Sequence, residues 1–125
     1  MIGSEVEIVL DTNIVLYLLS GDETISGFLQ GREAYVSVIT ELELIGYPDI
    51  SAKELVRIKE FLKNCTVIEI NEDIKTLYTH IRKQYRLKLG DAAAAATAIY
   101  LDLPFMSADK GFNKVKELQF TLYSR

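Results

Sequence analysis

Short apolar runs alternate along this chain with longer stretches in which apolar residues recur every three or four positions. The runs are rich in β-branched residues and predict strands, whereas the spaced stretches predict amphipathic helices. We expect strands at Glu5–Leu10, Ala34–Val38, Thr66–Ile70, Pro104–Ser107 and Leu118–Tyr123. We expect helices at Ile14–Leu19, from a cap at Thr40 to about Gly46, at Ala52–Asn64, from a cap at Asn71 to about Leu87, and at Gly90–Leu101. The segment after Gly21 is predicted only as a charged connection to the second strand.

This alternation of strands and helices predicts an α/β fold. Because the connections between strands are helical, we expect a central, mostly parallel sheet of about five strands, with helices on both faces. No repeat, linker or composition shift divides the chain, so residues 1–125 are expected to form one domain. The run Ala92–Ala96 is interpreted as a helix whose small side chains let it lie close against the sheet.

Composition excludes several classes of protein. Hydrophobic residues make up 49% and charged residues 26% of the chain, a balance typical of a globular fold and too apolar for a disordered one. The longest apolar run, Ala92–Leu101, is about half of what a bilayer requires, and Met1–Glu5 lacks the basic start of a signal peptide. A single cysteine, Cys65, cannot form an internal disulfide. These features predict a cytoplasmic protein with no membrane contact.

The charge balance limits how the chain would bind a phosphate-bearing partner. Fourteen Lys and Arg against 18 Asp and Glu give a net charge of −4. A broad basic face for nucleic acid is therefore not expected, and a phosphate substrate would need bound metal or a local basic strip. Candidates for such a strip are Arg86, Lys88, Lys110 and Lys114, for which a solvated charged edge is the simpler interpretation.

Several acids fall at the carboxyl ends of the predicted strands, where ligands bind in open α/β sheets. Asp11 ends the first strand, Glu41 and Glu43 follow the second, Asp91 opens the helix before the fourth, and Asp109 follows the fourth. Each acid also has a local explanation as a cap or turn residue, and Glu43 has capping-box spacing from Thr40. Those local explanations do not account for their gathering at one edge of the sheet.

Electrostatic repulsion favours a metal at such a cluster. Two carboxylates about 5 Å apart repel by roughly 3 kcal/mol at an effective dielectric near 20. Three or four such groups would remove a large share of a stability of about 5–15 kcal/mol. A divalent cation such as Mg²⁺ or Mn²⁺ would neutralise them, and oxygen ligands suit these ions.

Four segments of the sequence resemble, in order, the motifs of PIN-domain nucleases. They are Ile8–Asn13, Val36–Gly46, Lys88–Ala98 and Leu103–Phe112. The length of the chain and the sequences of its motifs are most similar to those of the VapC-type toxins of toxin–antitoxin pairs. Ser107 stands where a threonine is more usual, which keeps the hydroxyl, and the glycine of the second motif arrives one residue early. Gly90 stands where a proline or another small residue often precedes the aspartate, a change that we interpret as harmless.

The resemblance implies a PIN-like fold and a Mg²⁺- or Mn²⁺-dependent endoribonuclease that acts on single-stranded RNA. It also implies a small inhibitory antitoxin, pairing of two toxin copies, and a catalytic metal site formed by Asp11, Glu43, Asp91 and Asp109. Glu41 remains an alternative to Glu43, because a helical wheel places Glu43 opposite the apolar Leu42 and Ile45.

Other polar residues receive smaller roles. Thr12, Asn13, Thr40 and Ser107 are candidates for positioning the acids or water, with local capping as the alternative. His80 is interpreted as a structural or surface residue, and Cys65, at a strand start, as a small buried hydrophobe.

Three other functions are possible for an α/β domain with these residues. A phosphatase of the haloacid dehalogenase type would need a second aspartate where Asn13 stands, and a response-regulator receiver would need paired acids after its first strand. A third alternative is a PIN domain that binds metal or RNA as a regulatory module with little turnover. Cleavage of RNA with Mn²⁺ discriminates this module from an enzyme.

Overall fold

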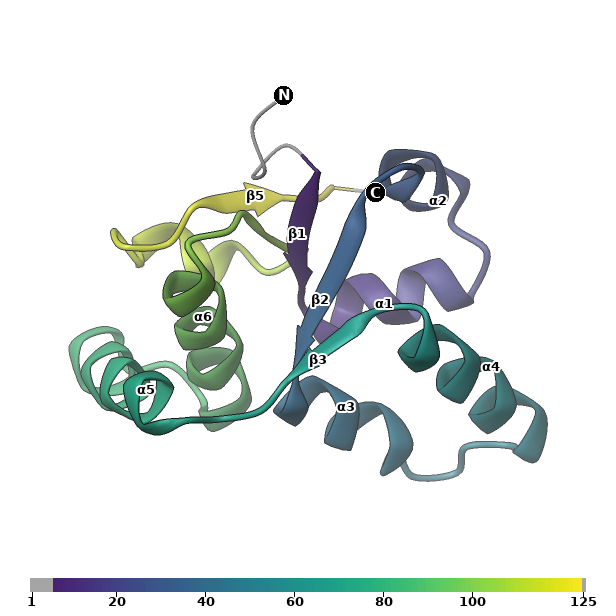
Figure 1. Cartoon of the computed structure of the whole chain (residues 1–125), viewed down its shortest axis with the longest axis horizontal. Coiled ribbons are helices and arrows are strands. Elements are labelled where there is room, and N and C mark those ends of the chain that lie inside the picture. Colours follow the sequence, from purple (N-terminus) through teal and green to yellow (C-terminus); the bar gives the residue numbers. More distant parts are fainter. Residues whose placement is uncertain (1–5, 125) are drawn as a thin grey trace.

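A five-stranded parallel sheet forms the centre of the molecule in a computed structural model that describes residues 6–124 (Figure 1). Its strands are β1 (Glu7–Leu10), β2 (Glu33–Ser37), β3 (Thr66–Ile68), β4 (Phe105–Ser107) and β5 (Phe120–Leu122), arranged in the order β3-β2-β1-β4-β5. Val9 pairs with Tyr35 on one side and with Phe105 on the other. The predicted α/β fold is confirmed, and every strand pair is parallel.

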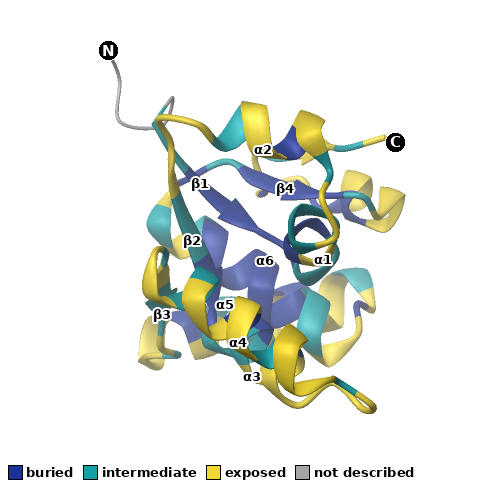
Figure 2. Cartoon of the chain, turned by 90° about the vertical axis from the view of Figure 1, so that its right-hand side faces the viewer, coloured by how far each residue is buried: buried dark blue, intermediate teal, exposed yellow. Residues whose placement is uncertain are grey.

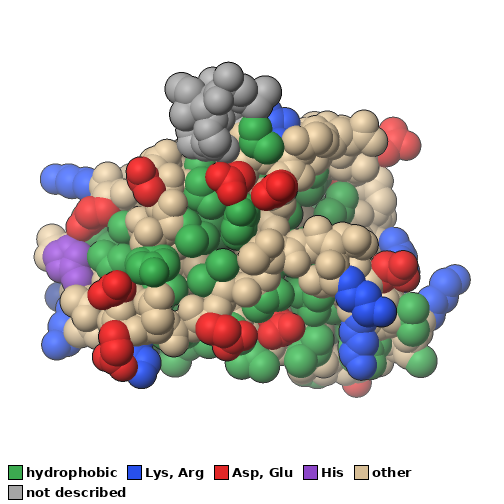
Figure 3. Space-filling view, in the orientation of Figure 1, with side chains coloured by type: hydrophobic (Ala, Val, Ile, Leu, Met, Phe, Trp, Pro, Cys, Tyr) green, Lys and Arg blue, Asp and Glu red, His purple; other side chains and the backbone are tan. Residues whose placement is uncertain are grey.

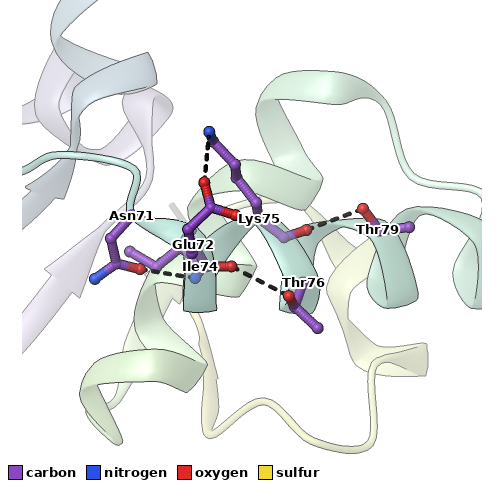
Figure 4. Close-up of polar contacts among 6 residues, drawn as sticks. All are labelled: Asn71, Glu72, Ile74, Lys75, Thr76 and Thr79. Atoms are coloured by element: carbon purple, nitrogen blue, oxygen red, sulfur yellow. Dashed lines mark hydrogen bonds and ion pairs between the residues drawn. The ribbon is translucent and has the colours of Figure 1, made fainter.

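Helices connect each strand to the next along the chain. They are α1 (Thr12–Leu19), α2 (Glu23–Leu29), α3 (Val38–Ile45), α4 (Ala52–Lys63), α5 (Glu72–Tyr85) and α6 (Leu89–Leu101), with a short 3-10 helix, η2, at Lys110–Lys114. Most begin at a polar cap. At the start of α5, for example, Asn71 accepts a hydrogen bond from the backbone of Ile74, and Lys75 pairs with Glu72 (Figure 4).

Two apolar clusters fill the two faces of the sheet. Because successive strand residues point to opposite faces, Val9 packs with α5, α6 and η2, whereas Ile8 and Leu10 pack with α1 to α4. Ala92 to Ala98 of α6 are all buried, so this helix lies tightly against the sheet, as predicted (Figure 2). None of the helices within residues 6–124 is both long enough and apolar enough to cross a membrane.

Several predicted boundaries were wrong. The charged connection contains α2, which Asp22 caps by accepting a hydrogen bond from Ile25. Strand β2 starts at Glu33 and ends at Ser37, and β3 and β5 are shorter than predicted. The first strand was expected from Glu5, but Met1–Glu5 lie outside the described residues. None of these changes alters the order of the elements.

The cap predicted at Thr40 was also wrong. Ser37 is the N-cap of α3, and its Oγ accepts a hydrogen bond from the backbone N–H of Ile39 at 3.2 Å. Val38 and Ile39 continue the apolar run of β2, so the sequence pattern hid the point where strand becomes helix. Thr40 therefore lies inside α3, and Glu43 is not part of a capping box with it.

Candidate functional site

Asp11 links the end of β1 to the start of α1. Its Oδ1 accepts a hydrogen bond from the backbone of Thr12 at 2.9 Å, so it caps α1 as well as facing the site. Its Oδ2 accepts a bond of 2.7 Å from the hydroxyl of Ser107. Burial raises the pKa of Asp11 to about 6, and the negative charges of Asp91 and Glu43 add to this rise, while the two hydrogen bonds oppose it.

Glu43 points from α3 toward the start of α1. Its Oε1 lies 2.6 Å from the hydroxyl of Thr12, the length expected of an O–H donor bonded to a carboxylate. The same Thr12 hydroxyl lies 3.2 Å from the hydroxyl of Thr40, which is only 1% exposed. Since Thr12 has one hydroxyl proton and gives it to Glu43, Thr40 is the donor between the two threonines.

Glu41 lies on a different side of α3. It lines a groove between α3 and α4 together with Lys59 and Lys63, and its charge acts on Cys65. The helical-wheel argument for Glu41 assumed that Leu42 and Ile45 face inward, but they are 53% and 40% exposed. Glu43, opposite them, can therefore face the carboxyl ends of the strands.

Asp91 and Asp109 approach the same region from the other side of the sheet. Asp91 lies in the first turn of α6, and its pKa is raised by burial and then by the charges of Asp109 and Glu43, with Lys88 opposing the rise. Asp109 caps η2 by accepting a hydrogen bond from Gly111 at 2.8 Å. It is exposed, unlike Asp11, which is 7% exposed.

Asn13 and Ser107 connect α1 to the end of β4. The amide nitrogen of Asn13 donates to Ser107 at 3.2 Å and to Asp11 at 3.3 Å, and its oxygen accepts from the backbone of Ala108 at 3.2 Å. The buried Ser107 hydroxyl also accepts from the backbone of Asp109 at 3.0 Å. Local capping alone therefore does not explain these residues, because Asn13 bonds to Ser107 and Ala108, and Ser107 to Asp11, across more than 90 positions of the chain.

The four predicted carboxylates thus come from the N-caps of α1 and η2 (Asp11 and Asp109), from α3 (Glu43) and from the first turn of α6 (Asp91). Figure 1 shows α3 and α6 beginning near the ends of β1 and β2. The charges of Asp91 and Glu43 act on Asp11, and those of Asp109 and Glu43 act on Asp91. Within residues 6–124, however, no three of the chain's Asp, Glu, His or Cys side chains are close enough together to hold a metal ion as they stand.

The chemistry of this group of residues suits a hard divalent cation. The donors are all carboxylate oxygens, which Mg²⁺ and Mn²⁺ prefer. The pKa values of Asp11 and Asp91 are raised first by burial and then by neighbouring acids, and a nearby cation would favour the charged forms of both groups. Hydroxyl and amide groups around the acids fix their orientation, as outer groups do in metal sites.

The residues of the predicted basic strip are exposed, as is His80, whereas Cys65 is half-buried. Arg86 ends α5 with a positive φ of 55°, Lys88 precedes α6, and Lys110 and Lys114 are the first and last residues of η2. His80 lies on the surface of α5 and hydrogen-bonds to Glu117 at 2.9 Å, and Cys65 packs half-buried beside α4.

Comparison with known proteins decides the family. The profile of the PIN domain family matches residues 8–118, nearly the whole chain. The chain belongs to the PIN domain family. None of the curated proteins compared matches it. The resemblance identified from the four motifs is confirmed at the level of this family.

Several solved structures resemble this PIN domain over most of their length. A chain of a toxin–antitoxin complex from Klebsiella pneumoniae is 28% identical, with a TM-score of 0.76 over 89% of this chain and 94% of that one. A chain of VapBC-1 from nontypeable Haemophilus influenzae is 26% identical, with a TM-score of 0.73 over 93% and 97%. A chain of VapBC2 from Rickettsia felis, bound to a promoter DNA fragment, has a TM-score of 0.84 over 94% and 99%, at 17% identity.

One contributor to the site was missed in the sequence. Gly90 of this PIN domain lies directly against the carboxylate of Glu43. A glycine beside Asp91 at a helix start gives no signal of such a contact, because the contact depends on a residue 47 positions earlier in the chain.

Proposed function

We propose that this PIN domain is a Mg²⁺- or Mn²⁺-dependent endoribonuclease that cleaves single-stranded RNA and acts as the toxin of a toxin–antitoxin pair. The observation that carries the proposal is the electrostatic contact among Asp11, Glu43, Asp91 and Asp109, which come from four separate parts of the chain. The charges of Asp91 and Glu43 add to the rise in the pKa of Asp11, and those of Asp109 and Glu43 add to the rise in the pKa of Asp91. A purely structural role gives no reason to place mutually repelling acids together. The similar toxin–antitoxin structures support the biological part.

The four carboxylates would hold one or two hydrated metal ions. Such an ion, when bound, lowers the pKa of a water, orients it toward the phosphorus and stabilises charge on the leaving oxygen. Ser107 and Asn13 hold the Asp11 carboxylate by its Oδ2, so that this group keeps its direction. Thr12 does the same for Glu43.

RNA binding would depend on the basic residues next to the acids. Lys88 is the cation whose charge acts on Asp91, and Lys110 directly follows Asp109. In Figure 3, Asp and Glu side chains lie in separate groups across the face, and Lys and Arg lie mostly toward its sides. We propose that Lys88, Lys110, Arg86 and Lys114 attract the phosphates of a single strand, which a negatively charged molecule would otherwise repel.

We propose two protein partners, a small antitoxin and a second copy of the chain. Large apolar side chains are exposed on neighbouring helices, namely Leu16 on α1, Leu42 and Ile45 on α3, and Val56 on α4. Leu16 lies one turn after Thr12, the residue that bonds to Glu43, and therefore on the same side of α1, so an antitoxin seated there would lie beside the proposed site. Light scattering at micromolar concentration is expected to give twice the chain mass of 14.1 kDa, and a monomer mass would contradict pairing.

The decisive experiment is cleavage of a fluorescent single-stranded RNA by purified protein, with Mn²⁺ and with EDTA. We expect cleavage that EDTA abolishes and that is lost in Glu43→Gln. Glu41→Gln is the matched control, because it removes a carboxylate from the same helix but outside the site, and it should cleave normally. A parallel single-stranded DNA tests the choice of substrate.

Three results would argue against parts of the proposal. Cleavage of the DNA alone would overturn the RNA assignment. Mn²⁺ binding by calorimetry without any cleavage would favour a regulatory binding module. Equal loss of activity in Glu41→Gln and Glu43→Gln would contradict the assignment of Glu43 to the site.

A further inference from the structure

The carboxylate of Glu43 occupies the space that a side chain at position 90 would fill. A Cβ built on Gly90 would lie 2.9 Å from Oε2 of Glu43, 3.5 Å from its Cδ and 3.7 Å from its Oε1. These three atoms are the nearest ones to that Cβ, and real Cβ atoms essentially never come within 3.0 Å of another heavy atom. Gly90 lies at an ordinary helical φ, so its backbone conformation does not require glycine.

Neither side of this contact can absorb an added methyl group without moving the carboxylate. On one side, α6 is fixed to the sheet by residues Ala92 to Ala98, all of which are buried. On the other side, the second carboxylate oxygen of Glu43 already lies 2.6 Å from Thr12, at the short end of the range for such bonds. The flexible Glu43 side chain is therefore the part that would move, away from Thr12.

We infer that Gly90 is a positioning residue for the metal site, because a side chain at this position would push against the Glu43 carboxylate where it bonds to Thr12 and faces Asp91. This inference rests on the proposed function, since it assigns Gly90 a role toward the same metal. Gly90 acts through Glu43 and touches no substrate.

The test compares two glycine-to-alanine variants in helices. Gly90→Ala should weaken Mn²⁺ binding by about 10- to 100-fold in calorimetry, the usual effect of disturbing a group that orients a metal ligand. Gly27→Ala is the matched control, because Gly27 lies in α2 and a Cβ there would meet nothing within 4 Å. It should bind Mn²⁺ as the wild type does. Both variants should remain folded in a thermal scan, because alanine favours a helix more than glycine does and the Thr12–Glu43 bond that Gly90→Ala breaks is exposed.

A Glu43→Ala background tests whether Gly90 acts through Glu43. With the carboxylate gone, adding Gly90→Ala should change Mn²⁺ affinity no further. A further loss of the same size in that background would show that Gly90 acts by another route and would overturn the inference.

Crystal structures of the two metal-free variants separate this inference from the proposed function. In Gly90→Ala the Glu43 carboxylate should leave Thr12, and in Gly27→Ala the bond of 2.6 Å should remain. An unmoved Glu43 in Gly90→Ala would refute the positioning role even if the protein binds metal. Failure of the wild type to bind Mn²⁺ would instead refute the proposed metal site and, with it, the role of Gly90 toward a metal.

Discussion

At the scale of single residues, the candidate site combines strong hydrogen bonding with electrostatic repulsion. Asp11 receives hydrogen bonds from Ser107, Asn13 and Thr12, which favour its charged form. Burial and two neighbouring acids favour its neutral form, and they prevail, since the pKa rises to about 6. Hydrogen bonds thus fix the position of the side chain, while burial and neighbouring charges disfavour its ionised form. This combination is typical of a functional carboxylate.

This balance predicts how stability depends on pH in the absence of metal. Because the pKa of Asp11 in the folded protein, about 6, lies above its ordinary value of 3.8, folding is favoured when Asp11 is protonated. That contribution is complete below about pH 3.8 and is lost as the pH rises through 6. Between pH 7 and pH 5, we expect Asp11 to add about 1 kcal/mol to the free energy of unfolding.

Urea unfolding in EDTA at the two pH values measures this effect, and Asp11→Asn supplies the control because it removes the titrating group. The gain at pH 5 should be smaller in the variant by about 1 kcal/mol. Equal pH dependence in both proteins would contradict the raised pKa.

Replacing Asp11 should separate stability from activity. Asn has nearly the shape of Asp and caps a helix about equally well, while it removes one charge from a repelling group. We therefore expect metal-free Asp11→Asn to be as stable as the wild type at pH 7, or more stable. Metal-dependent RNA cleavage should be abolished, because a neutral amide is a poor substitute for a carboxylate on a hard cation.

Thermal unfolding and the RNA cleavage assay measure these effects. Glu41→Gln is the control, because it also removes one negative charge but lies outside the candidate site. Wild-type cleavage by Asp11→Asn, with EDTA excluding a contaminating nuclease, would mean that Asp11 serves only as a helix cap.

At the scale of elements, apolar periodicity predicted most of the fold, and its errors have local causes. Helix α2 was missed because it buries only Ile25 fully and contains Ser26 and Gly27, which are poor helix formers. Helix α3 was placed too late because two hydroxyl residues, Ser37 and Thr40, both fit a cap. Only the three-dimensional arrangement shows that Ser37 bonds to Ile39, whereas Thr40 faces Thr12.

The same limit applies to the candidate site. The sequence predicted which acids follow which strands, because parallel strands bring their carboxyl ends to one edge. It left Glu41 and Glu43 open, because the choice depends on which face of α3 packs inward, and both Leu42 and Ile45 are exposed against expectation. Contacts between distant segments, such as that of Gly90 with Glu43, cannot be predicted from the local pattern of apolar and polar residues.

The cap of α3 gives a prediction at this scale. Ser37→Ala removes the buried side-chain acceptor for the backbone N–H of Ile39. We expect the free energy of unfolding to fall by about 1 kcal/mol in a urea titration. Thr79→Ala is a suitable control, because Thr79 is exposed and bonds only within its own helix at Lys75, and it should change stability little. Equal effects of the two changes would mean that Ser37 does not cap α3.

At the scale of the whole molecule, the site adds negative charge to a chain that is already negative. The net charge is −4, and three of the four site carboxylates act on Asp11 or Asp91 in a way that disfavours ionisation. Folding brings these charges together, so the native state carries a repulsion that the unfolded chain does not. A cation that binds only the native state would relieve this repulsion and stabilise the protein as a whole.

We therefore expect Mn²⁺ or Mg²⁺ at millimolar concentration to raise the thermal unfolding midpoint. An ion present at 100 times its dissociation constant stabilises the native state by about 2.7 kcal/mol, provided that the unfolded chain does not bind it. Screening of charge by salt would also stabilise a negative protein, so the comparison must be with NaCl at the same ionic strength. The shift should persist in Glu41→Gln and shrink in Glu43→Gln, because only Glu43 lies within the carboxylate group. A shift of the same size with NaCl, or in both variants, would show that the ions act on overall charge, and the clustered site would then be wrong.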